Sequence, residues 1–220
     1  MLWRTRAGAQ HPNNGTYDMH TRKVKSVMAL ALALALATPV LQAEETEPNA
    51  MLQAVTLEVI AAMKRERGQH DANQKQVASL VETKVLPLFD FSRMTQIAVA
   101  RNWRLATPEQ QLALTGEFKA LLVRTYSAAL STYRDQVIEF RSMRSAPADI
   151  DVTVRSVVKQ PGTAPIAMDY DMEKTPTGWK VYDIKVAGVS LVTTYRDTFS
   201  ERIREDGVDG LIKALEEKNR

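Results

Sequence analysis

The chain has 220 residues, no cysteine, three histidines and a formal net charge of +3. Without cysteine, its core must hold the fold with no disulfide framework. The first 43 residues hold five of the 29 basic and one of the 26 acidic residues, so the remaining 177 carry 24 basic and 25 acidic residues, a formal net charge of −1. That balance gives no support to nucleic-acid binding, and we expect no such partner.

Residues 1–43 have the layout of a secretory signal peptide behind a polar extension. Basic residues precede an uncharged apolar run at 27–37, which is short for a membrane span. A proline breaks this run, and Leu41-Gln42-Ala43 offers a cleavage site. We therefore expect residues 1–43 to be removed on export and residues 44–220 to form one domain. An N-terminal membrane anchor is the alternative.

One histidine, His70, lies beyond this leader, in a polar stretch typical of a solvated loop. A single histidine and no cysteine exclude zinc sites of ordinary composition, Ser-His-Asp triads and Cys-His dyads. The sequence also has no phosphate-binding loop. We expect no metal and no cofactor.

Helical periodicity dominates the first part of the exported chain. Apolar stripes predict helices over 51–63 and 73–86, where Pro87 stops the second. A short helix follows Asp90 or Ser92, and residues 101–104 form a connection. A long helix then extends to about Tyr133. Its start is marked by a capping residue, a proline at the first position and a capping-box partner, namely Thr107, Pro108 and Gln110.

Residues 137–186 change to the alternation of β-strands. Turn residues at 161–162 and 176–178 separate the last three strands by short connections, which predicts an antiparallel meander. Two C-terminal helices are expected over 190–218, the first ending at Gly207. The four expected strands are 137–141, 150–158, 166–172 and 179–186.

Helices over 51–133, then a sheet, then returning helices indicate an α+β fold, with a four-stranded antiparallel sheet packed against a helical subdomain. The helical stripes present more apolar surface than one such sheet covers. One explanation is a well-packed core, and the other is a cleft that holds an apolar ligand. The spacing of apolar residues does not separate the two, although Met94, Met168 and Met172 suit an adaptable wall.

Two polar groups are candidates for other roles. Asp183 is expected to share its side of a strand with Trp179 and Val181, and it can act either as a general base or as a structural acid paired with Lys185 or Arg196. Asp169 and Asp171 are expected to face water. A basic-aromatic cluster can meet anionic headgroups or a partner protein, or can be arginines packed around a tryptophan; its residues are Arg101, Trp103 and Arg104, with Arg93 nearby.

Several blocks in order resemble the MlaC family of periplasmic phospholipid-binding proteins. The resemblance runs from about Met51 to the C-terminus. It is carried by Phe89-Asp90-Phe91-Ser92-Arg93-Met94, Trp103-Arg104-Leu105-Ala106-Thr107-Pro108-Glu109-Gln110-Gln111, Phe118 with Leu121-Leu122-Val123-Arg124-Thr125-Tyr126, and Gly188-Val189-Ser190-Leu191-Val192 with Tyr195-Arg196 and Phe199.

The resemblance implies a carrier without enzymatic activity, built from an NTF2-like sheet and a helical subdomain with a lipid cleft between them. It implies transfer of diacyl phospholipid through the periplasm. The implied partners are an outer-membrane lipoprotein–porin complex and an inner-membrane ABC transporter complex with its substrate-binding membrane component. The alternative is an NTF2-like periplasmic enzyme with Asp183 as general base.

The candidate cleft residues are apolar or aromatic side chains from the predicted helices and strands, and none is assigned a catalytic role. They are Phe91, Met94, Ile97, Trp103, Phe118, Leu122, Tyr126, Leu130, Val152, Val154, Ile166, Met168, Tyr170, Val181, Val189, Leu191 and Val192.

Overall fold

The computed structural model describes residues 47–65, 79–131, 136–143, 146 and 148–220. The predicted leader, His70 and the start of the second predicted helix lie outside these residues. Within the described segments, no helix combines the length and the hydrophobicity needed to cross a bilayer.

The N-terminal helices are α2 (Pro48–Arg65), η1 (Val81–Val85) and η2 (Leu86–Leu88). The predicted helix end before Pro87 corresponds to the end of η1 at Val85, and Pro87 lies in the 3-10 turn η2, whose first positions do not need the N–H that proline lacks. Lys180 Nζ also donates to the Pro87 carbonyl oxygen at 2.6 Å. Together these contacts fix the end of this segment beside the sheet.

The next helices form the core of the helical part: α4 (Phe91–Val99), η3 (Ala100–Leu105) and α5 (Pro108–Ser131). Asp90 caps α4 by accepting from the Arg93 N–H at 2.8 Å. The predicted capping box of α5 is confirmed: the Gln110 N–H donates to Thr107 Oγ1 and the Thr107 N–H donates to Gln110 Oε1. Residues 101–104 are a 3-10 helix rather than an irregular connection.

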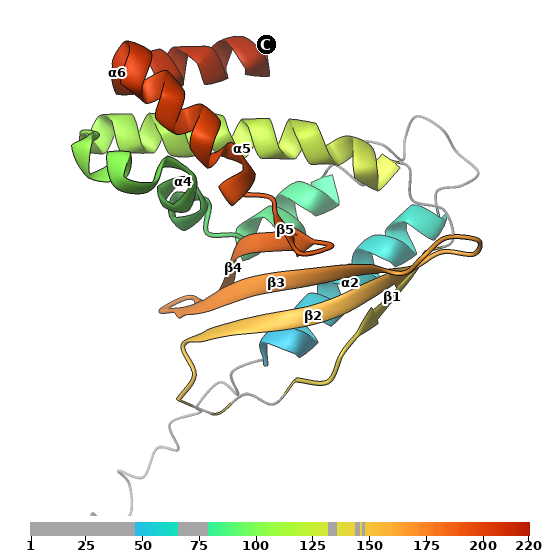
Figure 1. The fold of residues 1–220 in the computed structure, drawn as a ribbon. Coiled ribbons are helices and arrows are strands. Elements are labelled where there is room, and N and C mark those ends of the chain that lie inside the picture. The colour runs from blue at the N-terminus through green and yellow to red at the C-terminus, as the bar shows by residue number, and fades with distance from the viewer. Residues whose placement is uncertain (1–46, 66–78, 132–135, 144–145, 147) are drawn as a thin grey trace, which may run out of the picture. The chain divides into compact units, whose positions relative to one another are not determined.

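The sheet has five strands in sequential order, and neighbouring strands are antiparallel (Figure 1). The α+β class and the meander are confirmed, but the predicted number of four strands is wrong. The strands are β1 (Val137–Phe140), β2 (Asp151–Lys159), β3 (Ile166–Thr175), β4 (Gly178–Val186) and β5 (Val189–Ser190).

The fifth strand exists because a two-residue turn folds the chain back after β4. Ala187 and Gly188 have φ of 50° and 82°, the positive values of a type I′ turn, and Val186 pairs with Val189. The first C-terminal helix therefore does not begin at 190. A 3-10 turn, η4 (Thr193–Tyr195), leads into α6 (Arg196–Asn219), which is kinked at Gly207 with φ 71°.

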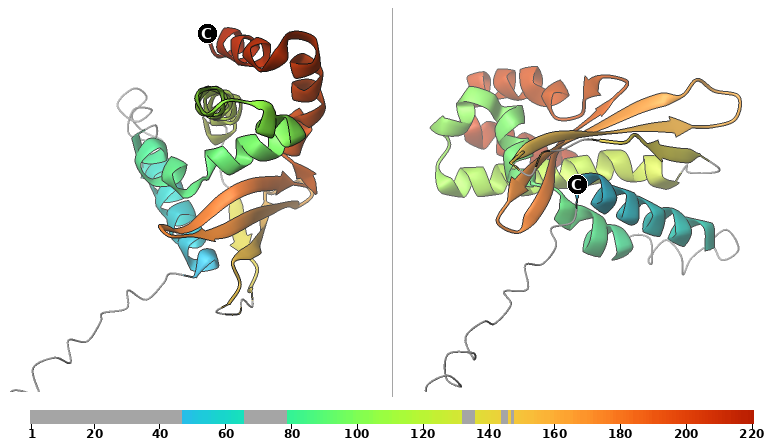
Figure 2. Two further views of the ribbon diagram at one scale, coloured as in Figure 1. Left: turned by 90° about the vertical axis from the view of Figure 1, so that its left-hand side faces the viewer. Right: turned by 90° about the horizontal axis from the view of Figure 1, so that it is seen from below.

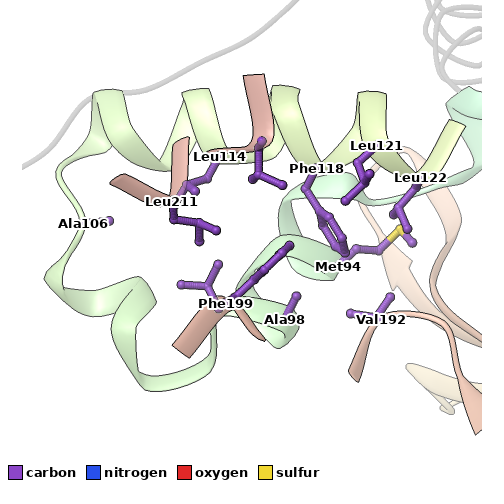
Figure 3. Close-up of a cluster of buried hydrophobic side chains, with 12 residues drawn as sticks. Met94, Ala98, Ala106, Leu114, Phe118, Leu121, Leu122, Val192, Phe199 and Leu211 are labelled. Atoms are coloured by element: carbon purple, nitrogen blue, oxygen red, sulfur yellow. The ribbon is translucent and has the colours of Figure 1, made fainter. Parts of the chain in front are cut away.

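Two apolar clusters organise the described residues. The helical cluster joins α4, α5 and α6 to Val192, and its side chains point toward one another in Figure 3. Phe118 makes edge-to-face contacts with Tyr195 and Phe199, each at 5.2 Å between ring centroids. The sheet cluster consists of Leu52, Val154, Met172, Trp179 and Val181.

Phe89 packs against both clusters and forms a parallel bridge to Val181. The Asp90 N–H donates to the Val181 carbonyl oxygen at 2.9 Å, which ties the start of α4 to β4. The helices α4, α5 and α6 therefore lie beyond the β4–β5 edge, and α2 lies along one face of the sheet (Figures 1 and 2).

The turn between β4 and β5 gives a stability prediction. Asparagine adopts positive φ more readily than alanine, so Ala187→Asn should raise the free energy of unfolding by about 0.5–1 kcal/mol. Ala187→Val is the matched control and should lower it, since a β-branched side chain is strained at positive φ. Urea unfolding followed by circular dichroism measures both. Equal stability of the two variants would contradict the type I′ turn.

Candidate functional site

The sheet has one apolar face, defined by the strand register. Directly paired residues of antiparallel strands project to the same side, so the pairs Val152–Met172 and Val154–Tyr170 make one continuous apolar set. The set, here called the apolar sheet face, is Ile138, Phe140, Val152, Val154, Val158, Ile166, Met168, Tyr170, Met172, Val181, Ile184 and Val186.

Helix α2 covers only part of the apolar sheet face. Leu52 is buried and packs with the sheet cluster, whereas Met168, Tyr170 and Ile184 remain half-buried. The rings of Phe140 and Tyr170 stack at 6.3 Å and are also only half-buried. The apolar residues of α2 after Leu52 keep partial exposure as well; they are Val55, Val59, Ile60 and Met63. These surfaces leave apolar area that an elongated apolar ligand can cover.

The candidate residues are divided between the two clusters. The helical cluster buries Met94, Phe118, Leu122 and Val192 and packs partly exposed Phe91, Ile97, Trp103 and Tyr126 against them. On the apolar sheet face, Val154 and Val181 are fully buried and Val152, Met168 and Tyr170 are half-buried. Ile166 and Val189 are exposed at the sheet ends and Leu191 is half-buried; the Leu130 side chain lies outside the described residues.

The candidate list from the sequence left out several apolar side chains on this face and beside it, among them Phe140, Ile184, Leu52 and Phe89. Phe140 and Ile184 could have been predicted, because the alternation of their strands marks them as apolar positions on a half-buried strand. Leu52 could also have been predicted, because it belongs to the apolar helical stripe at 51–63. Phe89 had no local signal, since its place between the clusters depends on its bridge to Val181.

A network around Arg93 fixes the start of α4 against residues of β2, β3 and β4. Arg93 Nη1 lies 2.6 Å from Glu173 Oε2, and its Nη2 lies 3.4 Å from Asp151 Oδ2. The guanidinium also lies 4.3 Å from the ring centroid of Tyr182. The Tyr182 hydroxyl donates to Asp151 Oδ1 at 2.9 Å, and burial together with this carboxylate raises the pKa of Tyr182 to about 12.

Asp183 lies on the face opposite the apolar sheet face, contrary to the prediction. A register shift between Asp171 and Met172 pairs Asp183 with Asp171 but Val181 with Met172, so Asp183 and Val181 project to opposite sides. Asp171 is also buried rather than facing water, since Lys185 Nζ lies 2.6 Å from one of its oxygens and Thr153 Oγ1 donates to the other.

The Asp183 carboxylate holds the chain where it leaves the sheet. Its Oδ1 accepts from the Val192 N–H at 3.3 Å, and the side chain is buried. Burial raises the pKa of Asp183, partly offset by hydrogen bonds from Ser190 and from the backbone of Val192. The partners named in the prediction are elsewhere: Lys185 pairs with Asp171, and Arg196 donates to the Ile97 carbonyl oxygen.

Among the described residues, no group of three or more histidine, aspartate or glutamate side chains is placed to hold a metal ion. The apolar sheet face presents side chains that exclude water rather than groups that transfer protons. Side chains of this kind can cover an apolar ligand by excluding water.

The chain is similar to known proteins over most of its length. A family model described as MlaC protein matches residues 53–217. The toluene tolerance protein ttg2D of Pseudomonas putida is 26% identical over 181 residues, covering 81% of this chain and 83% of that protein. The intermembrane phospholipid transport system binding protein MlaC of Haemophilus influenzae is 22% identical over 176 residues, covering 79% and 82%.

The chain is also similar to solved structures. One of them is the phospholipid-binding protein from Ralstonia solanacearum in complex with a phospholipid, with a TM-score of 0.70 and 42% sequence identity. The match covers 79% of this chain and 97% of that one.

The buried carboxylate gives a pH prediction. Because its pKa is higher in the folded state than in the unfolded chain, Asp183 binds a proton more tightly when folded. Protonation of Asp183 therefore stabilises the folded state at low pH. This stabilisation is lost as pH rises through the folded-state pKa. Asp183→Asn keeps an oxygen acceptor for the Val192 N–H, so it should equal or exceed the wild type in stability at pH 7, and this advantage should shrink toward pH 4.

Urea unfolding at both pH values measures this difference. Glu216→Gln, an exposed position on α6, is the control and should change stability little at either pH. If Asp183→Asn lost more than about 1 kcal/mol at pH 7, the charge itself would be needed at this joint.

Proposed function

This chain belongs to the MlaC family, and on that premise we propose that it binds diacyl phospholipid by the acyl chains and carries it across the periplasm. The observation that carries the proposal is the apolar sheet face, which α2 leaves partly uncovered. A 42%-identical protein that holds a phospholipid supports it. The signal-peptide pattern of residues 1–43 supports export, with residues 44–220 as the working domain.

Burial of the acyl chains supplies the affinity. Each methylene removed from water contributes about 0.8 kcal/mol, so two chains with roughly 30 methylenes represent roughly 25 kcal/mol against water. A charged hydrogen bond to a headgroup contributes only about 1.5–3 kcal/mol. The chains therefore dominate, and the carrier should accept different headgroups.

We propose that the partly exposed members of the apolar sheet face contact the chains directly, Val152, Met168 and Tyr170 above all. The candidates buried in the helical cluster then act as the packed support of the cleft, since Phe118 and Val192 are fully buried among other side chains. Movement of α2 relative to the sheet is the simplest way to vary the space between them, because its apolar residues after Leu52 are only half-covered.

The carrier proposal includes two docking partners, an outer-membrane lipoprotein–porin complex and an inner-membrane ABC transporter complex with its substrate-binding membrane component. Support comes from the relative whose name is an intermembrane phospholipid transport system binding protein. A carrier in this role needs no catalytic group. The enzyme alternative rests on Asp183, whose Oδ1 already accepts from the backbone and which lies on the face opposite the apolar surface.

A substitution on the apolar sheet face tests the binding site. Met168 is half-buried on that face, so Met168→Glu should place a carboxylate against the acyl chains and abolish copurified phospholipid. Ala167→Glu is the matched control, because its side chain is exposed on the opposite face one residue away, and lipid should be retained. Organic extraction of equal amounts of folded protein, followed by mass spectrometry, gives the occupancy.

Equal phospholipid in the two variants would remove the apolar sheet face from the binding site. No phospholipid in the unsubstituted protein would overturn the carrier proposal itself. Under the carrier proposal, the Asp183→Asn variant should keep its copurified phospholipid. The enzyme alternative does not predict that phospholipid is retained.

The headgroup composition of the bound lipid tests the energy argument. Because the acyl chains dominate the affinity, phospholipid extracted from the purified protein should contain the headgroups of the host membrane in similar proportions. Mass spectrometry with internal standards makes the comparison. A single headgroup taken from a mixed membrane would contradict it and would point to a specific headgroup contact.

A further inference from the structure

An open pocket of about 450 Å³ lies on the helical part of the protein, away from the apolar sheet face. None of its lining residues belongs to the sheet or to α2. Three arginines surround an aromatic and aliphatic floor, and we call the site the arginine pocket; its main residues are Arg101, Arg104, Arg196, Trp103, Ile97 and Ala100.

Two of these guanidinium groups are available to a ligand. Arg101 and Arg104 are exposed, and neither appears in an ion pair among the described residues, where Arg93, Arg202 and Arg204 do. Three guanidinium groups therefore lie together on one small surface of a domain whose formal net charge is −1 without the leader. Such a surface attracts a negatively charged partner and orients its approach.

The third arginine is held in place. Arg196 Nε and Nη2 donate to the Ile97 carbonyl oxygen at 3.3 and 3.2 Å, and its remaining N–H groups can still donate. A guanidinium held this way loses little further conformational freedom when it binds an anion.

The backbone of the pocket is held in an uncommon conformation. Ala100 has φ 54° and ψ −130°, which a residue with a side chain rarely adopts. This residue turns the chain sharply from α4 into η3 and so brings Arg101, Trp103 and Arg104 beside Ile97. Strained residues that persist in a fold are concentrated at functional sites.

We propose that the arginine pocket is a docking site for an acidic segment of a partner protein, which inserts aspartate or glutamate side chains between the guanidinium groups. Arginine matches a carboxylate through two parallel hydrogen bonds. Arginine and tryptophan together are the residue types that contribute most to binding energy at protein interfaces. A hollow fits a protruding segment better than a flat membrane surface, and a few basic residues are a weak membrane anchor by themselves.

The test uses a synthetic acidic peptide as the probe. Blocked hexaglutamate is titrated into the isotope-labelled purified protein at 20 mM salt, and NMR shifts of the Trp103 indole N–H and of the backbone amides at 96–104 are followed. Binding should shift these signals. The Kd should rise about tenfold or more at 200 mM salt, and blocked hexaglutamine should leave the signals unchanged.

Arg101→Gln with Arg104→Gln should weaken hexaglutamate binding about tenfold or more. Arg141→Gln with Arg155→Gln is the matched control, because it removes the same charge from exposed positions of the sheet region and should leave the Kd unchanged. Equal weakening in both double variants would overturn the proposal in favour of a general charge effect. Failure of the unsubstituted protein to bind the peptide would also overturn it.

Vesicles separate the protein partner from a membrane. Cosedimentation uses vesicles of 70% phosphatidylcholine and 30% phosphatidylglycerol. If vesicle binding depended on Arg101 and Arg104 while hexaglutamate failed to bind, the partner would be a lipid surface and the proposal would be wrong. Copurified phospholipid should be the same in all variants, so failure here is distinguishable from failure of the carrier proposal.

Discussion

Strand β4 is hydrogen-bonded along both edges. A one-residue shift in its register places its side chains in two different packing environments. At one edge it pairs with β3; at the other it pairs with β5 and receives the Asp90 N–H at the Val181 carbonyl. The shift turns Val181 into the sheet cluster and Asp183 to the opposite face, where its carboxylate holds the Val192 N–H. Val192 is buried in the helical cluster. Strand β4 therefore connects the two clusters, together with Phe89, which packs against each of them, and it helps to position the helices.

This arrangement separates stability from binding. The helical cluster is closed, with Phe118, Leu114 and Val192 fully buried, and it can supply folding energy whether or not a ligand is present. The apolar sheet face is different, because its residues toward β1 and the strand ends are only half-buried. Under the proposed function the protein must release its ligand, so part of its apolar surface cannot be closed by its own side chains.

Local signals were enough to predict most elements. The capping box at Thr107 and Gln110 placed the start of α5, and alternation placed β2 and β3 with the correct residues facing the apolar side. The strand after Gly188 was missed because alanine is not the usual first residue of a type I′ turn. The prediction of the side of β4 on which Asp183 lies was wrong. A register shift depends on the partner strand and cannot be seen in the alternation of one strand alone. Helical stripes identify a buried face but not its partners, so they could not show that Phe118 packs against Tyr195 and Phe199.

The arginine pocket and the apolar sheet face use different interactions. This difference explains why the two surfaces lie apart in the fold. Burial of acyl chains scales with apolar area and is not weakened by charge screening, whereas recognition through guanidinium groups is weakened by salt and depends on geometry. Charges beside the acyl site would have to be desolvated when a lipid entered, at a cost that would oppose binding. The arginines instead lie on α4, η3 and the start of α6, which the Arg93 network and the Asp183 carboxylate fix against the sheet. Under the two proposals, a partner at the arginine pocket would contact elements connected to β4, so its binding energy could act on the joint between the clusters without contact with the lipid.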